Sequence, residues 1–235
     1  MEFDYTYTTL FGAQIFEPVT ILTNAAIALV CAYAFFQLNK TKTVTAIQWS
    51  MFFLLIGLSS VIGSLGHGVH YQLGNSFFKC VEFTMNAISL IAIYYCYQAA
   101  HTNYSSEKNK HTKLIRNIVI TWITLLLLIT IWFSNFTLIK IHAGIVLSYS
   151  LIVHIITHKR KIPGSGWIAF GIAVSFLSIL THSLKIKLSD WFNHKDISHL
   201  IMAISLLLIF KGVQLKVRFI ENNLLEDSLN YSEVV

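Results

Sequence analysis

Residues 45–71 read TAIQWSMFFLLIGLSSVIGSLGHGVHY, a run without a single aspartate, glutamate, lysine or arginine. A helix needs about 20 consecutive apolar residues to cross the hydrocarbon core of a bilayer, so this run is long enough to span a membrane. Lipid offers no water to bond backbone polar groups, and a continuous run of this length therefore predicts a helix rather than a barrel strand. Two histidines, His67 and His70, lie close to its end.

Six further apolar runs follow the same pattern, separated by short polar segments. The predicted spans are residues 17–38, 45–71, 78–100, 114–133, 138–156, 167–186 and 197–213. Hydrophobic residues make up 55% of the chain and charged residues 12%, which is too apolar for a water-soluble surface. We therefore predict an all-α membrane protein whose residues 1–235 form a single domain, a seven-transmembrane helix bundle.

The distribution of basic residues predicts the orientation of this bundle. One set of alternate loops holds Lys40, Lys42, Lys108, Lys110, Lys113, Arg116, Lys159, Arg160, Lys161, Lys211, Lys216 and Arg218, and the other set holds only Lys79, Lys140, Lys185, Lys187 and Lys195. Cytoplasmic loops carry the excess of basic residues. The N-terminus is therefore expected outside and the C-terminus in the cytoplasm, where residues 216–235 form a short polar tail.

The net charge of +6 is explained by this loop pattern, so we expect no nucleic-acid partner. The predicted location is an integral, multi-pass position in the plasma membrane, which is the inner membrane of a bacterium, or in an endomembrane. The sequence does not indicate an oligomeric state.

Histidines cluster at the ends of the spans that are predicted to face outward. Six of the ten histidines lie there: His67, His70, His142, His182, His194 and His199. An ionisable side chain at the edge of the apolar layer costs a few kcal/mol unless it has a partner, so such residues often belong to functional sites. A metal ion is the most economical shared partner for several imidazoles, and zinc takes three or four such ligands.

The start of the last predicted span is rich in polar groups. Asp196 lies about one helical turn before His199, where a carboxylate can orient a metal-binding ring or share the ligation. Asn193 and Asp196 also have the spacing of a helix cap, which is the structural alternative for both. His194 lies five residues before His199, a spacing that an intact helix does not bring onto one face.

Two acidic residues enter the apolar layer on the same side. Glu17 begins the first span seven residues before Asn24, which places both on one helix face, and Glu82 begins the third. Each acid either belongs to the site or stabilises the amino terminus of its helix through the helix dipole.

This combination resembles the seven-span superfamily of alkaline ceramidases and progestin/adiponectin-type receptors, whose members look like intramembrane zinc hydrolases. The residues that carry the resemblance are, in helix order, Glu17, Thr23 and Asn24, then Ser64 with His67 or His70, then Glu82, and finally His199. One departure is Lys195, which stands four residues before His199, where the family has another histidine. The third metal ligand is therefore open among His194, Asp196, His70 and His182.

The resemblance implies an intramembrane zinc-dependent hydrolase that cleaves a lipid amide or ester, as ceramidases do, in the outer-leaflet half of the membrane. The predicted metal ligands are His67, His199, His194 and His70. The predicted catalytic residues are Ser64, Asp196 and Glu82, with Glu17, Asn24 and His182 in supporting positions around them. A membrane lipid is the expected substrate.

Two alternatives from other classes remain open. A haem b-binding electron-transfer protein also holds its iron with histidines from facing helices. A non-catalytic lipid-binding or receptor protein would use the same polar pocket without chemistry.

Overall fold

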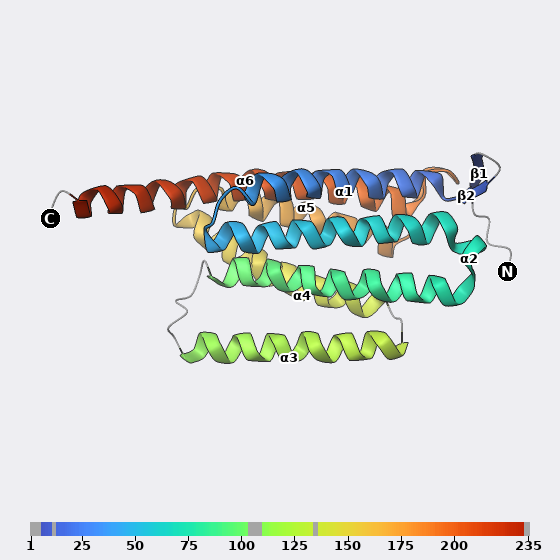
Figure 1. Cartoon of the computed structure of the whole chain (residues 1–235), viewed down its shortest axis with the longest axis horizontal. Coiled ribbons are helices and arrows are strands. Elements are labelled where there is room, and N and C mark those ends of the chain that lie inside the picture. The colour runs from blue at the N-terminus through green and yellow to red at the C-terminus, as the bar shows by residue number, and fades with distance from the viewer. Residues whose placement is uncertain (1–5, 11–12, 103–109, 134–135, 233–235) are drawn as a thin grey trace.

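The computed structural model describes residues 6–10, 13–102, 110–133 and 136–232, almost all of them helical. Six helices follow a short antiparallel hairpin of two strands (Figure 1). The elements in chain order are β1 (Tyr7–Leu10), β2 (Ala13–Phe16), α1 (Pro18–Leu38), α2 (Val44–Thr102), α3 (Lys110–Phe133), α4 (Phe136–Lys159), α5 (Ser165–Ser183) and α6 (His194–Ser232).

Helix α2 contains two of the predicted spans and folds back on itself near its middle. The reversal occurs at Gly74, whose φ of 77° and ψ of 172° are not helical. Glycine adopts such a positive φ without the steric penalty that a Cβ brings. With the two limbs of α2 counted separately, the described part of the chain has seven helical segments.

Six of the segments are long and apolar enough to cross a membrane: Pro18–Leu38, Val44–Gly68, Gly74–Thr102, Thr137–Lys159, Ser165–Ser183 and His194–Leu225. The prediction of a multi-pass helical membrane protein is confirmed. The seventh span at residues 114–133 and the orientation of the bundle stay predictions. Helix α6 also continues as a helix to Ser232, through most of the segment that we expected as a polar tail.

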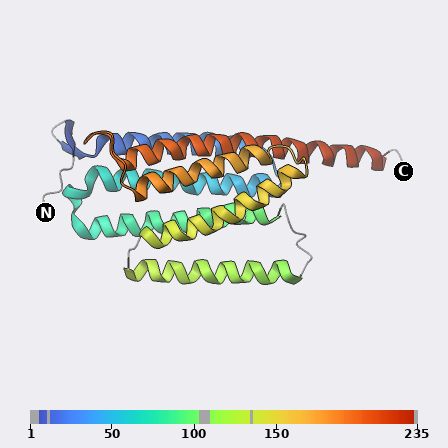
Figure 2. The same cartoon turned by 180° about the vertical axis from the view of Figure 1, so that it is seen from behind.

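The helices lie nearly side by side, with α3 at one edge of the bundle, as the two opposite views show (Figure 1, Figure 2). Helices α5 and α6 pack most closely. A Cβ added at Gly171 would lie 2.7 Å from Cγ1 of Ile209, and one at Gly212 would lie 2.6 Å from the carbonyl oxygen of Gly164. Small residues of this kind let membrane helices approach without a gap.

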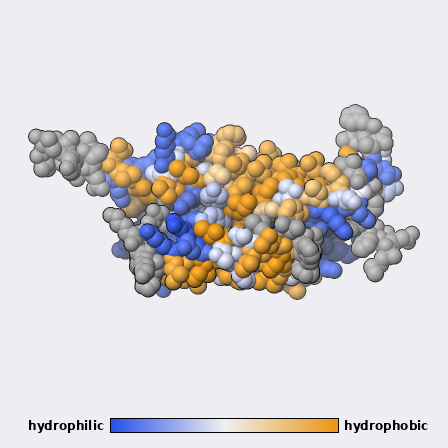
Figure 3. Space-filling model, turned by 60° about the horizontal axis from the view of Figure 1, so that its bottom comes forward, coloured by the Kyte–Doolittle hydropathy of each residue, from blue (hydrophilic) through white to orange (hydrophobic). Residues whose placement is uncertain are grey.

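Apolar side chains fill the core and also cover the outside of the bundle. The buried core includes Trp49, Phe53, Ile172, Leu206 and Val213. Leucines and isoleucines are exposed along the helices, and Figure 3 shows apolar residues across the middle of one face, with hydrophilic residues gathered toward both ends. An exposed apolar surface of this extent is expected where lipid surrounds a protein.

The amino-terminal end of the bundle is the end that positions the candidate site. The hairpin, the start of α1, the reversal of α2 and the start of α6 all lie there (Figure 1). The backbone N–H of Glu17 donates to the carbonyl oxygen of Thr6 at 2.9 Å, and the side chain of Gln72 donates to the carbonyl oxygen of Gln14. The hairpin is thereby tied to α1 and α2 at this end.

Candidate functional site

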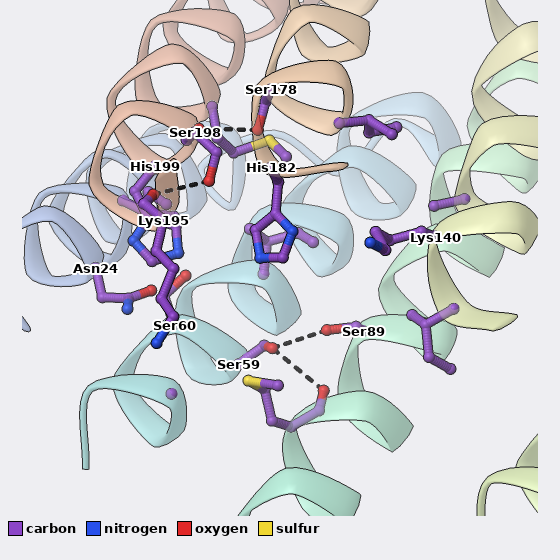
Figure 4. Close-up of a pocket in the computed structure, with 18 of the residues that line it drawn as sticks. Asn24, Ser59, Ser60, Ser89, Lys140, Ser178, His182, Lys195, Ser198 and His199 are labelled. Atoms are coloured by element: carbon purple, nitrogen blue, oxygen red, sulfur yellow. Dashed lines mark hydrogen bonds between the residues drawn. The ribbon is translucent and has the colours of Figure 1, made fainter. Parts of the chain in front are cut away.

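A cavity of about 450 Å³ lies among the helices, lined by residues of α1, both limbs of α2, α4, α5 and α6. Its walls are mainly apolar side chains such as Ile27, Ile56 and Leu206. The polar side chains on it are Asn24, Ser59, Ser60, His67, Glu82, Ser89, Lys140, Ser175, Ser178, His182, Lys195, Ser198, His199 and Ser205. Figure 4 shows many of these groups from different helices facing a common space.

His67 on α2 is held by Glu17 at the start of α1. Nδ1 of His67 lies 2.5 Å from Oε2 of Glu17. An ionised carboxylate only accepts hydrogen bonds, so the ring donates from Nδ1, and in the neutral ring the lone pair is then on Nε2. The predicted site role of Glu17 is therefore compatible with its position, because it orients a histidine that lines the cavity.

His199 on α6 is held in the same way by Thr23 on α1. Nδ1 of His199 lies 3.1 Å from Oγ1 of Thr23, whose own hydroxyl donates to the carbonyl oxygen of Thr20 at 3.1 Å. Since that proton is already directed to Thr20, we assign the proton of the second bond to the His199 ring. Nε2 of the neutral His199 ring then carries the lone pair, as it does in the neutral form of His67.

Glu17 also binds a cation from α6. Its Oε1 lies 2.7 Å from Nζ of Lys195, so one carboxylate joins α1, α2 and α6. Burial alone would raise the pKa of Glu17, but the hydrogen bonds and charges of His67 and Lys195 outweigh it and lower that pKa to about 2. Glu17 precedes the spanning segment and has a φ of 44°, a conformation that non-glycine residues seldom adopt outside constrained sites.

The first turn of α6 is closed by a reciprocal cap. The side chain of Asn193 accepts from the N–H of Lys195 at 2.8 Å, and Asp196 accepts from the N–H of Asn193 at 2.7 Å. The other oxygen of Asp196 accepts from Oγ1 of Thr20 at 2.7 Å. The carboxylate of Asp196 is therefore committed to the cap and to α1, which is the structural alternative considered for it.

The donor chemistry of His67 and His199 fits zinc. Metal-binding histidines typically coordinate through one ring nitrogen while the other donates to a protein oxygen, and both rings have that arrangement. A catalytic zinc ion takes three protein ligands. Among the described residues no group of three or more His, Cys, Asp or Glu side chains is arranged to hold a metal ion, and Lys195 stands on α6 where the resemblance implies a histidine. His67 and His199 stay the predicted ligands, and the third stays open.

The remaining predicted residues are distributed around this pair. Glu82, Asn24 and His182 line the cavity. His194 packs its ring against that of His182, with ring centroids 5.2 Å apart. The side chain of His70 lies outside the part of the structure that is described.

Ser64, a predicted catalytic residue, lies on the side of α2 that is packed against α1. Its hydroxyl faces α1 and donates to the carbonyl oxygen of Ile21 at 3.4 Å, and it is not among the side chains that line the cavity. Ser60, one turn earlier on the same limb of α2, lines the cavity instead. His142 also points elsewhere, because its Nδ1 accepts from the indole N–H of Trp122 on α3 at 3.0 Å.

The sequence analysis did not identify several residues of the site. Thr20 follows Glu17 by three residues and precedes Thr23 by three. A search for polar residues at helical spacing would therefore have found these three residues on one helix face. The serines of the cavity, such as Ser178 and Ser198, carry no such signal, because serines are also common where membrane helices pack closely.

The fold and this site define a polytopic helical membrane protein with a cluster of polar side chains that line an internal cavity. The chain belongs to the family DUF6962, a family of unknown function whose model matches residues 19–217. No curated protein matches the chain, and no solved structure does.

Proposed function

We propose that this protein is an intramembrane hydrolase that cleaves an amide or ester bond of a membrane lipid, with a zinc ion held by His67 and His199. The observation that carries the proposal is the matched pair of imidazoles. They come from different helices, both have Nδ1 bonded to an oxygen of α1, and both line one cavity. His182, the third imidazole on that cavity, is our choice for the remaining ligand.

The shape and lining of the cavity support a lipid as the substrate. Ligand sites are typically concave and mainly apolar, with a few polar groups that fix the orientation of the ligand. Here the apolar walls between the helices suit an acyl chain, and the histidines and charged side chains of the lining come from the helix ends at the amino-terminal end of the bundle. A lipid would enter sideways from the outer leaflet and would need no aqueous channel.

Other side chains are assigned to ring positioning, oxyanion stabilisation and proton transfer. Glu17 and Thr23 fix the rings of His67 and His199, so that each keeps its lone pair on Nε2. Ser60 is the cavity hydroxyl that we assign to donate to the developing oxyanion, and Glu82 is the cavity carboxylate that we assign to accept a proton. Zinc, when bound, supplies a nucleophile at neutral pH by lowering the pKa of water.

The test is hydrolysis by the purified full-length protein in lipid nanodiscs supplied with zinc. Fatty-acid release from a ceramide, from a monoacylglycerol and from a lysophosphatidic acid is measured for the wild type, His67→Ala and His199→Ala. His158→Ala is the control, because His158 is exposed and lies near the end of α4, away from the cavity. We expect release by the wild type and the control only. Equal release by all four proteins, or none above protein-free nanodiscs, would contradict the proposal.

Two measurements on the same material separate the alternative functions. A Soret absorption band with one haem per chain would favour the electron carrier. A lipid that co-purifies with the protein and is never turned over would favour the binding or receptor function.

A further inference from the structure

The amino-terminal end of the cavity holds a lysine that the proposed chemistry does not use. Lys140 lies in the second turn of α4, is half-buried and lines the cavity. Figure 4 shows its amine directed toward the ring of His182. A lysine near the end of a membrane helix usually extends its amine out to the headgroup region, so an amine placed on an internal cavity has a different role.

The charged groups near His182, toward which the amine of Lys140 is directed, are basic. His182 lies within electrostatic range of Lys140, His194 and Lys195. Of the acids nearby, Glu17 is bonded to His67 and Lys195, and Asp196 is bonded to Thr20 and to the cap of α6.

Glu82 is the one carboxylate among the described residues that line the cavity; Lys140 and Lys195 line it too, and Lys195 is paired with Glu17. Because the charged groups that act on His182 are basic, an acidic group on a ligand beside that ring would meet the positive charge of Lys140. Lysine binds carboxylates and phosphates as a compact point charge, so it discriminates between the two less than arginine does.

We propose that the lipid bound in this cavity has an anionic headgroup, a carboxylate or a phosphate, which binds Lys140 while the acyl chain lies along the apolar walls. The inference deepens the proposed function, since it names the class of lipid at the same site. It concerns binding only, so it is tested without turnover. If the wild-type protein hydrolyses no lipid but still selects anionic headgroups, the proposed function is refuted and this inference stands.

The test is competition for a radiolabelled single-chain lipid on the full-length protein in nanodiscs. The competitors are palmitic acid, palmitoyl lysophosphatidic acid and hexadecanol, which differ mainly in the headgroup. We expect at least one anionic competitor to bind about tenfold more tightly than hexadecanol, which corresponds to about 1.4 kcal/mol. The tighter of the two acids identifies carboxylate or phosphate as the natural group. Equal binding of all three would overturn the proposal.

Two variants that change the charge of the cavity in opposite directions extend the test. Lys140→Gln should lower the affinity for the anionic competitor to that for hexadecanol and leave the affinity for hexadecanol unchanged. Glu82→Gln should raise the affinity for the anionic competitor. Lys159→Gln is the control, because Lys159 is exposed at the far end of α4. Unchanged selectivity in Lys140→Gln would refute the role of this lysine. If that variant does not fold, as judged by its melting curve, the headgroup series on the wild type decides.

Discussion

Nζ of Lys195 lies 2.7 Å from Oε1 of Glu17, so a partly buried ion pair connects the first turn of α6 to the start of α1. The pair forms at the amino-terminal end of the bundle, where the other oxygen of the carboxylate is bonded to His67. It therefore stabilises the bundle and positions a ring of the candidate site at the same time.

Replacing Glu17 by glutamine should destabilise the protein markedly at neutral pH. The substitution leaves a partly buried Lys195 without its carboxylate, which we expect to cost about 1–3 kcal/mol, between the values for exposed and buried pairs. The matched control is Asp190→Asn, which breaks the exposed pair of Lys187 and Asp190 and should change stability by less than about 1 kcal/mol. Thermal unfolding in detergent, followed by circular dichroism, measures both. Equal melting temperatures for the two variants would contradict the larger stabilisation that we assign to the partly buried pair of Glu17 and Lys195.

The advantage of the wild type over Glu17→Gln should depend on pH in one direction. The pKa of Glu17 falls from 4.5 to about 2 in the folded protein, so its stabilising contribution is fully present above pH 4.5. As the pH falls from 4.5 toward 2, that contribution is lost. Melting temperatures at a series of pH values should show a constant difference near neutrality that shrinks below pH 4.5. A melting-temperature difference that grows as the pH falls would contradict the predicted direction of the pH dependence.

Replacing Gly171 by alanine should loosen the contact between α5 and α6. A Cβ at this position would lie 2.8 Å from the backbone nitrogen of Ile209 and 2.9 Å from the carbonyl oxygen of Ser205, so the helices must move apart. Overpacking of this kind costs about 1–3 kcal/mol. Gly144→Ala is the control, because nothing lies within 4 Å of a Cβ there. The melting temperature should fall only for Gly171→Ala, and equal melting of both variants would argue against this close packing.

Replacing Thr23 by valine should weaken zinc binding without removing a ligand. The substitution keeps the shape of the side chain but deletes the oxygen that bonds Nδ1 of His199. Loss of such an orienting partner typically reduces metal affinity by about 10–100-fold. Zinc titration with a fluorescent competitor measures the change, and Thr124→Val, whose hydroxyl bonds only a carbonyl of its own helix in the described structure, is the control. Equal affinity in Thr23→Val and the wild type would exclude the orienting role.

The predicted orientation is tested by cysteine labelling in intact cells. In a Cys80→Ser background the two remaining cysteines, Cys31 and Cys96, are fully buried. A new cysteine at the exposed Ser76, beside the reversal of α2, should react with a membrane-impermeant maleimide from outside. One at the exposed Arg160, beyond the end of α4, should react only after the cells are opened. The reverse pattern would place the N-terminus in the cytoplasm.

The fold was largely predictable because apolar runs of span length admit few structures in lipid. The cap formed by Asn193 and Asp196 was also predictable, since it depends on a local spacing. The bond between Glu17 and His67 was not, because it depends on how two helices rotate about their axes. Rotation also separates Ser64, which faces α1, from Ser60, which faces the cavity. Sequence spacing alone does not determine that rotation when small residues occupy several faces of α2.

The most direct measurement is the zinc content of the purified protein, determined by elemental analysis for the wild type, His67→Ala and His199→Ala. The account predicts about one zinc ion per wild-type chain and loss of the metal in both variants, with helix content unchanged and His158→Ala retaining it. A wild type that binds no zinc when the ion is supplied, or variants that bind as much as the wild type, would contradict a shared ion between the two rings.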